Sequence, residues 1–275
     1  MLGARTLPRC GRATCWRATS WLAFITTLLS LAGCSGIRPV NLTPSAEENR
    51  SQAPSVDSGS ALRLARATRQ GGDLASALQL YRNLVATTSV TPEVMVEFGD
   101  VQLEAGSPDD AIDTYSKVGA RSSARLGALL GLTRAYIDLG EPTKALDSVT
   151  EAQGLAPQDP RVLIDRGVAL DTLKRHAEAQ ECYRTVLAAA PRHVAARNDL
   201  ALSLALTGHY DEAIALMTPL VRSSTATPKE RENMAVIYGL MGDADRAAVL
   251  SRVDLDAGTT EANLAFLAAV RGTKP

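Results

Sequence analysis

Residues 194–217 read VAARNDLALSLALTGHYDEAIALM, and this stretch decides the fold. Leu200 and Leu204 lie four residues apart, the spacing of one helix face. Gly208 follows where that helix should end, because glycine readily adopts the positive φ found after a helix C-terminus. Ala213 and Met217, again four residues apart, indicate a second helix. The stretch therefore predicts two helices joined by a tight turn.

The same pattern recurs along the chain with a period of 34 residues. One position of the pattern is glycine in five units and lysine in the other: Gly72, Gly106, Gly140, Lys174, Gly208 and Gly242. Five residues later each unit has an alanine: Ala77, Ala111, Ala145, Ala179, Ala213 and Ala247. A single short unit cannot bury its own apolar face, so a fixed period of this length predicts stacked units.

The 34-residue unit resembles the tetratricopeptide repeat (TPR). The resemblance implies an all-α solenoid of about six helix-turn-helix repeats with a C-terminal capping helix. In each repeat the glycine ends helix A, and the alanine lies where helix B approaches it most closely. Lys174 must either adopt the glycine's conformation or displace the turn. We expect the solenoid over residues 61–270, the capping helix over Glu261–Val270, and a short tail over residues 271–275.

Composition and motifs limit the function. The net charge is −1, so the chain lacks the basic excess behind nucleic-acid binding by counterion release. The sequence contains no G-x-S-x-G, Walker, H-E-x-x-H or C-x-x-C motif. His176, His193 and His209 fall in predicted turns or loops, exposed to solvent and without a second ligand at a metal spacing. We therefore expect no enzyme activity, cofactor, metal, nucleic-acid partner or small-molecule substrate.

The N-terminus has the pattern of a secretory signal. Arg5, Arg9, Arg12 and Arg17 come before any acidic residue, and the apolar run Trp21–Leu31 follows them. The run ends in Leu31-Ala32-Gly33-Cys34, which resembles a bacterial lipobox. This resemblance implies a lipoprotein signal peptide over residues 1–33 and lipidation of Cys34, which would anchor the protein to a membrane. The alternative is an ordinary signal peptide followed by an unmodified cysteine.

The segment after Cys34 is expected to be a disordered tether. Residues 34–60 are rich in Ser, Pro, Asn and Glu and show no apolar period. Ser35 stands where an aspartate would favour retention in the inner membrane, so we expect the periplasmic face of the outer membrane. With Cys34 lipidated, Cys182 would be the only free thiol of the mature chain, and its helical context predicts a small core residue.

The TPR resemblance implies a binding groove lined by the fifth, ninth and twelfth positions of helix A. In this sequence these positions are Leu62, Arg66, Arg69, Val96, Asp100, Leu103, Leu130, Arg134, Ile137, Ile164, Val168, Asp171, Asn198, Leu202, Ala205, Glu232, Val236 and Gly239. The mixed, largely apolar character favours an extended or amphipathic apolar segment as the ligand. Our predicted groove residues are Arg134, Asn198, Leu202, Asn233 and Val236. The alternative is that the apolar residues pack on neighbouring helices and that each asparagine caps or bridges helices.

Residues 194–270 carry a more specific resemblance. Asn198, Asn233 and Asn263 each open a similar segment, continued by Asp199-Leu200-Ala201, Met234-Ala235 and Leu264-Ala265. With the segment Arg252-Val253-Asp254-Leu255, this stretch is similar to the TadD family of tight-adherence (Flp) pilus assembly lipoproteins. The resemblance implies an assembly factor that binds protein partners of a Flp (type IVb) pilus secretion apparatus, including its secretin. The alternatives are a pilotin-like TPR lipoprotein for a type IV pilus or type II secretin, and a general periplasmic TPR scaffold.

Overall fold

The structure is a computed structural model, and it describes residues 58–272. The chain divides into two units, Met1–Ala53 and Pro54–Pro275, and every described residue belongs to the second unit. The predicted signal peptide, Cys34 and the tether up to residue 57 lie outside the described residues, as do residues 273–275. Residues 58–60 are helical, so the first helix begins three residues before the expected start of the solenoid at residue 61.

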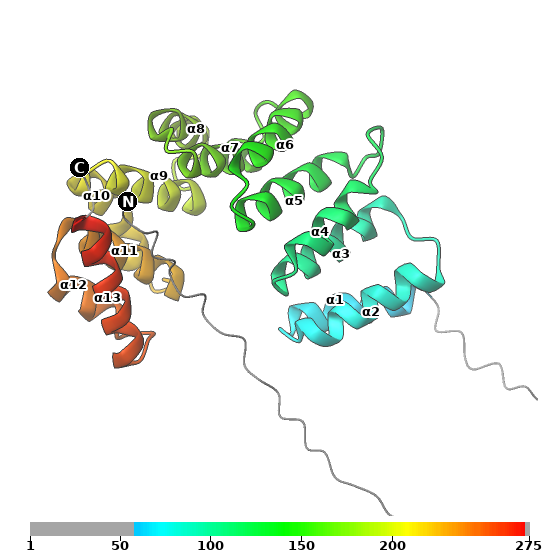
Figure 1. Cartoon of the computed structure of the whole chain (residues 1–275), viewed down its shortest axis with the longest axis horizontal. Coiled ribbons are helices and arrows are strands. Elements are labelled where there is room, and N and C mark those ends of the chain that lie inside the picture. Colours follow the sequence, from blue (N-terminus) through cyan, green and yellow to red (C-terminus); the bar gives the residue numbers. More distant parts are fainter. Residues whose placement is uncertain (1–57, 273–275) are drawn as a thin grey trace, which may run out of the picture. The chain divides into compact units, whose positions relative to one another are not determined.

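The described residues form thirteen α-helices and contain no strand (Figure 1). Helices A are α1 (Ser58–Gln70), α3 (Pro92–Glu104), α5 (Arg125–Asp138), α7 (Pro160–Thr172), α9 (Val194–Leu206) and α11 (Pro228–Met241). Helices B are α2 (Leu74–Thr87), α4 (Pro108–Ser116), α6 (Pro142–Leu155), α8 (His176–Ala189), α10 (Tyr210–Val221) and α12 (Ala244–Ser251). The last helix is α13 (Ala257–Gly272).

Each helix packs on its neighbours in the chain, and from α3 onward each helix A also packs on the next helix A. This stacking confirms the predicted all-α solenoid of six repeats. The helix predicted over residues 261–270 is part of α13, which begins four residues earlier and packs on both α11 and α12. It therefore covers the last repeat, as a C-terminal capping helix does.

The turns between helices A and B confirm the role assigned to the repeated glycine. Gly72, Gly106, Gly140, Gly208 and Gly242 all have positive φ, between 71° and 100°. Lys174 adopts the same left-handed conformation, with φ of 61°, instead of displacing the turn. Its backbone N–H donates to the Asp171 carbonyl at 2.9 Å, just as the Gly208 N–H donates to Ala205 at 3.1 Å. The fourth repeat thus keeps the turn geometry despite its side chain.

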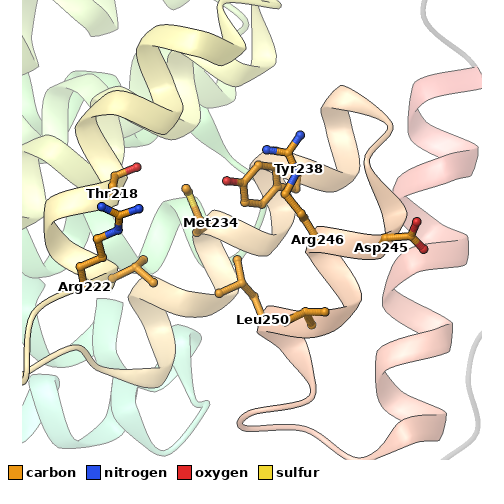
Figure 2. Close-up of a pocket in the computed structure, with 9 residues that line it drawn as sticks. Thr218, Arg222, Met234, Tyr238, Asp245, Arg246 and Leu250 are labelled. Carbon is orange, nitrogen blue, oxygen red and sulfur yellow. The ribbon is translucent and has the colours of Figure 1, made fainter.

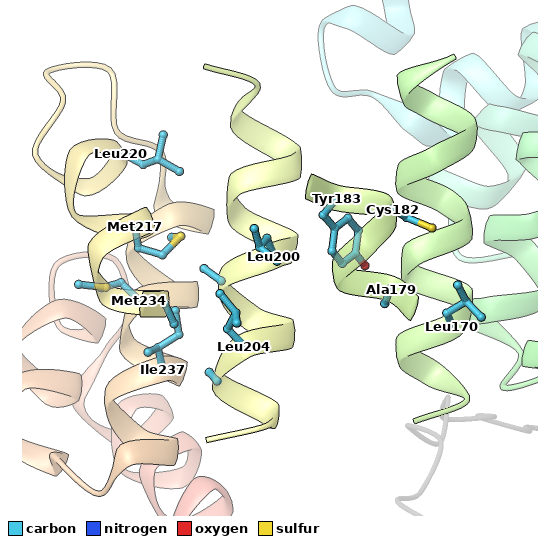
Figure 3. Close-up of a cluster of buried hydrophobic side chains, with 13 residues drawn as sticks. Leu170, Ala179, Cys182, Tyr183, Leu200, Leu204, Met217, Leu220, Met234 and Ile237 are labelled. Atoms are coloured by element: carbon cyan, nitrogen blue, oxygen red, sulfur yellow. The ribbon is translucent and has the colours of Figure 1, made fainter. Parts of the chain in front are cut away.

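The core lies between the two helix layers and is built around the repeated alanine, which is fully buried in all six repeats. Figure 3 shows the cluster around α9, where Leu200 and Leu204 have Tyr183 on one side and Met217 and Ile237 on the other. Cys182 belongs to this cluster, which confirms the expected core position, and burial raises the pKa of its thiol.

Glycines inside helices A make room for the tyrosines of helices B. A Cβ at Gly99 of α3 would lie 2.5 Å from Cε1 of Tyr115, and a Cβ at Gly131 of α5 would clash with the same ring. The Tyr115 ring therefore lies between two successive helices A. Gly167 of α7 has the same relationship to Tyr183. Aromatic rings thus occupy gaps that no larger helix A side chain could share.

Candidate functional site

The candidate site is the helix A face, which we define as the fifth, sixth, ninth and twelfth positions of successive helices A. Asn198 and Leu202 lie on α9, and Asn233 and Val236 lie on the adjacent α11. Arg134 lies on α5, which is separated from α9 by α7. The structure therefore brings four of the five predicted groove residues onto two neighbouring helices and leaves Arg134 apart from them.

The two asparagines are bonded to each other. Asn233 Nδ2 donates to Asn198 Oδ1 at 2.7 Å, and Asn198 Nδ2 donates to Asp199 Oδ1 at 3.3 Å. The Asn198 side chain is almost inaccessible, since the residue is only 4% exposed. This is the bridging arrangement given above as the alternative to peptide binding. Asn233 is half-buried.

The apolar predicted residues are half-buried. Leu202 packs against the core cluster around α9, and both it and Val236 keep part of their surface accessible. Other positions assigned to the groove line no open surface: Leu130, Ala205 and Gly239 are buried. The reason is that the next helix of the stack, a helix A or the capping helix α13, packs closely on this face. A Cβ at Gly239, for example, would lie 2.5 Å from Cδ1 of Leu267 in α13.

Arg134 joins two helices A instead of standing free. Its guanidinium lies 3.1 Å from Asp165 Oδ2 on α7, and the Asp165 side chain is only 11% exposed. Burial raises the pKa of the Asp165 carboxyl above its ordinary value, although Arg134 opposes this shift. The half-exposed guanidinium keeps part of its surface available to a ligand.

Polar contacts within and between repeats continue along the face towards the N-terminus. Arg66 of α1 donates two hydrogen bonds to Glu97 of α3, at 2.8 Å and 2.5 Å, and Glu97 also accepts from Tyr81 at 2.9 Å. Asp100 accepts from Tyr115 at 2.7 Å. The tyrosines thus fill the core with their rings and bind the helix A carboxylates with their hydroxyl groups.

Asp171 at the end of α7 contacts three side chains from two other helices, α8 and α9. It lies 2.8 Å from Ser203 Oγ on α9, 3.0 Å from Tyr183 Oη on α8 and 2.7 Å from His176 Nδ1. The sequence predicted an exposed turn for His176, and this was wrong, because the bond to Asp171 holds the ring half-buried at the start of α8. Asp171 therefore serves to join repeats four and five.

Sequence reasoning missed the acidic residues of the sixth helix A position. Glu97, Asp165 and Asp199 share this position with Asn233, at multiples of the same 34-residue period. The period itself was therefore the signal that could have found them. Burial raises the pKa of Asp199, although the hydrogen bond from Asn198 and the nearby Lys229 oppose this shift, and Asp199 forms no ion pair among the described residues. The helix A face of α7 and α9 is consequently acidic.

The described residues contain no group of three or more His, Cys, Asp or Glu side chains arranged to hold a metal ion. Within residues 58–272, no helix is long and apolar enough to cross a bilayer. The arrangement offers apolar surface, carboxylates and a partly free guanidinium on one face. The fold and this face define a helical-repeat scaffold that binds proteins.

Comparison with known families agrees with this class. One family model described as tetratricopeptide repeat matches residues 62–125 and 164–226, and a second with the same description matches residues 102–164. Together the matches run without a gap over more than half of the chain. The chain therefore belongs to the tetratricopeptide repeat family.

Individual relatives are more distant. The chain is 27% identical over 221 residues to the cellulose synthase 2 operon protein C of Komagataeibacter xylinus. This alignment covers 76% of this chain and 17% of that protein. It is 33% identical over 85 residues to the uncharacterized protein y4yS of Sinorhizobium fredii, covering 31% of this chain and 47% of that protein. The chain thus spans less than half the length of the curated relatives it matches.

Solved structures show the same fold. A thermophilic TPR protein of Thermus thermophilus superposes with a TM-score of 0.59 at 22% identity, covering 66% of this chain and 98% of that one. A tetratricopeptide repeat protein of Parabacteroides merdae gives a TM-score of 0.55 at 21% identity, covering 70% of this chain and 77% of that one.

Proposed function

We propose that this protein is a lipid-anchored TPR protein of the outer membrane that binds partners during assembly of a Flp (type IVb) pilus secretion apparatus. The observation that carries protein binding is the helix A face, where half-buried Leu202 and Asp199 lie on α9 and half-buried Val236 lies on the adjacent α11. The observation that favours the Flp system is the likeness of residues 194–270 to TadD lipoproteins, together with the lipobox ending at Cys34.

The chemistry of the face specifies the kind of segment it would hold. Leu202 and Val236 offer apolar contact, and Asp199 is a half-buried carboxylate that forms no ion pair within residues 58–272, although Lys229 lies near enough to lower its pKa. A ligand segment with apolar side chains and a nearby lysine or arginine would complement both features. Asn198 would act indirectly, because its bond to Asn233 holds α9 and α11 together.

A deletion strain tests the biological role. We expect loss of surface pili and of adherence, with normal growth and cell shape. Intact piliation would contradict the proposal, and cell-wall defects would favour the general scaffold. Loss of secretin multimers from a type IV pilus or a type II system, with Flp pili retained, would favour the pilotin-like alternative.

Complementation of this strain tests the helix A face. Leu202→Glu should fail to restore piliation, because the charge replaces apolar contact surface, whereas Val194→Glu should restore it. Val194 is a suitable control because it is an exposed residue of the same helix, at the first helix A position outside the helix A face. Equal rescue by both variants would exclude this face as the binding surface.

Complementation with Cys34→Ala tests the anchor separately. We expect the precursor to remain unprocessed or the product to be released from the membrane. Mass spectrometry of the wild-type protein should show an acylated N-terminus at Cys34. An unmodified N-terminus at another residue would contradict lipidation without affecting the assignment of the helix A face.

A further inference from the structure

A second surface lies on the helix B side of the last repeats. A groove of about 380 Å³ runs between α10 and α12 and has α11 as its floor. We call it the sixth-repeat groove, and its apolar part is lined by Val221, Met234, Tyr238, Val249 and Leu250. Figure 2 shows Met234 between Arg222 on one side and Arg246, stacked over Tyr238, on the other.

The solenoid contains an equivalent groove two repeats earlier. It lies between α6 and α8 with α7 as its floor, and it has the same volume of about 380 Å³. We call it the fourth-repeat groove. Five of its nine lining residues precede a lining residue of the sixth-repeat groove by 68 residues, or two repeat periods. The corresponding pairs are Gln153 and Val221, Arg166 and Met234, Glu178 and Arg246, Glu181 and Val249, and Cys182 and Leu250.

The two grooves differ in the charge of their helix B lining, although the fourth-repeat groove also has Arg166 where the sixth-repeat groove has Met234. Where the fourth-repeat groove has Glu178 and Glu181, the sixth-repeat groove has Arg246 and Val249. No other repeat has an apolar side chain as large as valine at the position of Val249. The residues at this position in the remaining repeats are Gln79, Asp113, Asp147 and Ala215. Val249 is nevertheless 67% exposed. The solenoid fold does not require an apolar residue here, so Val249 is a feature of this groove.

Two arginines line the groove, Arg222 and Arg246, and Arg246 is already ion-paired with Asp243. Arg222 is exposed and has no side-chain hydrogen bond or ion pair within residues 58–272. Arg246 is bonded through Nε to Asp243 at 2.5 Å and lies 4.6 Å from the centre of the Tyr238 ring, which holds its guanidinium in place. Asp245 also lines the groove, but Figure 2 shows its carboxylate directed away from Met234.

We propose that the sixth-repeat groove docks a segment of a partner protein in which a large apolar side chain stands next to an aspartate or glutamate. The apolar side chain would cover Met234, Val249 and Leu250. The carboxylate would pair with Arg222 and Arg246, and guanidinium groups bind carboxylates with good geometry. This second docking surface is independent of the helix A face, whose carboxylates select the opposite charge.

The test is a selection of random twelve-residue peptides on the full chain, run in parallel on matched variants. Arg246→Glu with Val249→Glu gives the sixth-repeat groove the glutamates that the fourth has at these two positions. Glu178→Arg is the control in the fourth-repeat groove. All three residues are exposed, and unchanged thermal unfolding would show that the variants are folded. We expect the wild type and the control to enrich peptides with an apolar residue beside Asp or Glu.

The affinity of one selected peptide for each variant then shows whether it binds in the sixth-repeat groove. We expect it to bind the double variant at least tenfold more weakly than the wild type, and more weakly as salt is raised. Equal binding to both, or enrichment of basic or uncharged peptides only, would overturn the proposal.

Sedimentation of the full chain provides a further check. A concentration-dependent dimer abolished by Val249→Glu would overturn it as well, because the occupant would then be a second copy of the chain.

Discussion

Asn233 donates a 2.7 Å hydrogen bond to Asn198 across the boundary between α9 and α11. The two residues are 35 positions apart and belong to successive repeats. Because Asn198 is almost fully buried, this bond replaces the water that its carbonyl oxygen would otherwise bind. Asn198 and Asn233 therefore hold successive repeats together, and the ligand contacts proposed for this region belong to the side chains beside them.

Replacing Asn198 by alanine should destabilise the solenoid. The change leaves Asn233 without its acceptor and removes the amide that donates to Asp199. Loss of a buried hydrogen-bond partner typically costs about 1–3 kcal/mol. Chemical unfolding followed by circular dichroism measures the effect. An unfolding midpoint equal to that of the wild type would contradict the bridging role.

Replacing Lys174 by glycine should stabilise the fourth repeat. Lys174 holds a left-handed conformation, which costs a residue with a Cβ roughly 1–2 kcal/mol. Part of this gain is lost because glycine is freer in the unfolded chain, so we expect a net increase of about 0.5–1 kcal/mol. The matched control is Gly140→Ala, which imposes the same strain on the third repeat and should lower stability. A gain in both variants would contradict the argument.

Replacing Gly131 by alanine should disturb the packing of Tyr115. The added Cβ would clash with a ring that is fully buried between α3 and α5. Overpacking of this kind typically costs about 1–3 kcal/mol. Gly154 of α6 is the control, since a Cβ there would meet nothing within 4 Å. Gly154→Ala should leave stability unchanged or raise it by up to about 1 kcal/mol, because alanine favours helix. Thermal unfolding of the pair separates packing from helix propensity.

Replacing Asp199 by asparagine should change how stability depends on pH. Burial raises the pKa of Asp199 above 3.8, so the folded protein binds this proton more tightly than the unfolded chain does. Ionised Asp199 therefore opposes folding at neutral pH, and its unfavourable contribution disappears as pH falls through the raised pKa towards 3.8. Asp199→Asn should be more stable than the wild type at pH 7, and this advantage should shrink on acidification. Urea unfolding at several pH values measures it, and an advantage that grew on acidification would contradict the assignment.

The sequence alone determined the helix pairs and their order. The glycine turns, the buried alanines and the positions of helices A and B all follow from interactions within one repeat, and the 34-residue period repeats the same information six times. For the same reason Cys182 was correctly placed in the core. Local spacing is sufficient for such features, because residues three or four apart on a helix share a face in any context.

Only the tertiary structure decided which of these side chains are free. The side-chain partners of Asn198, Arg134 and Asp171 lie on another helix. Whether two such side chains meet depends on how far each helix A is displaced from the next one. That displacement follows from packing, for example of Tyr115 between Gly99 and Gly131. Likewise, the lining of the sixth-repeat groove combines residues of α10, α11 and α12 that no local pattern connects. A one-dimensional repeat predicts the unit, whereas surface chemistry depends on contacts between units.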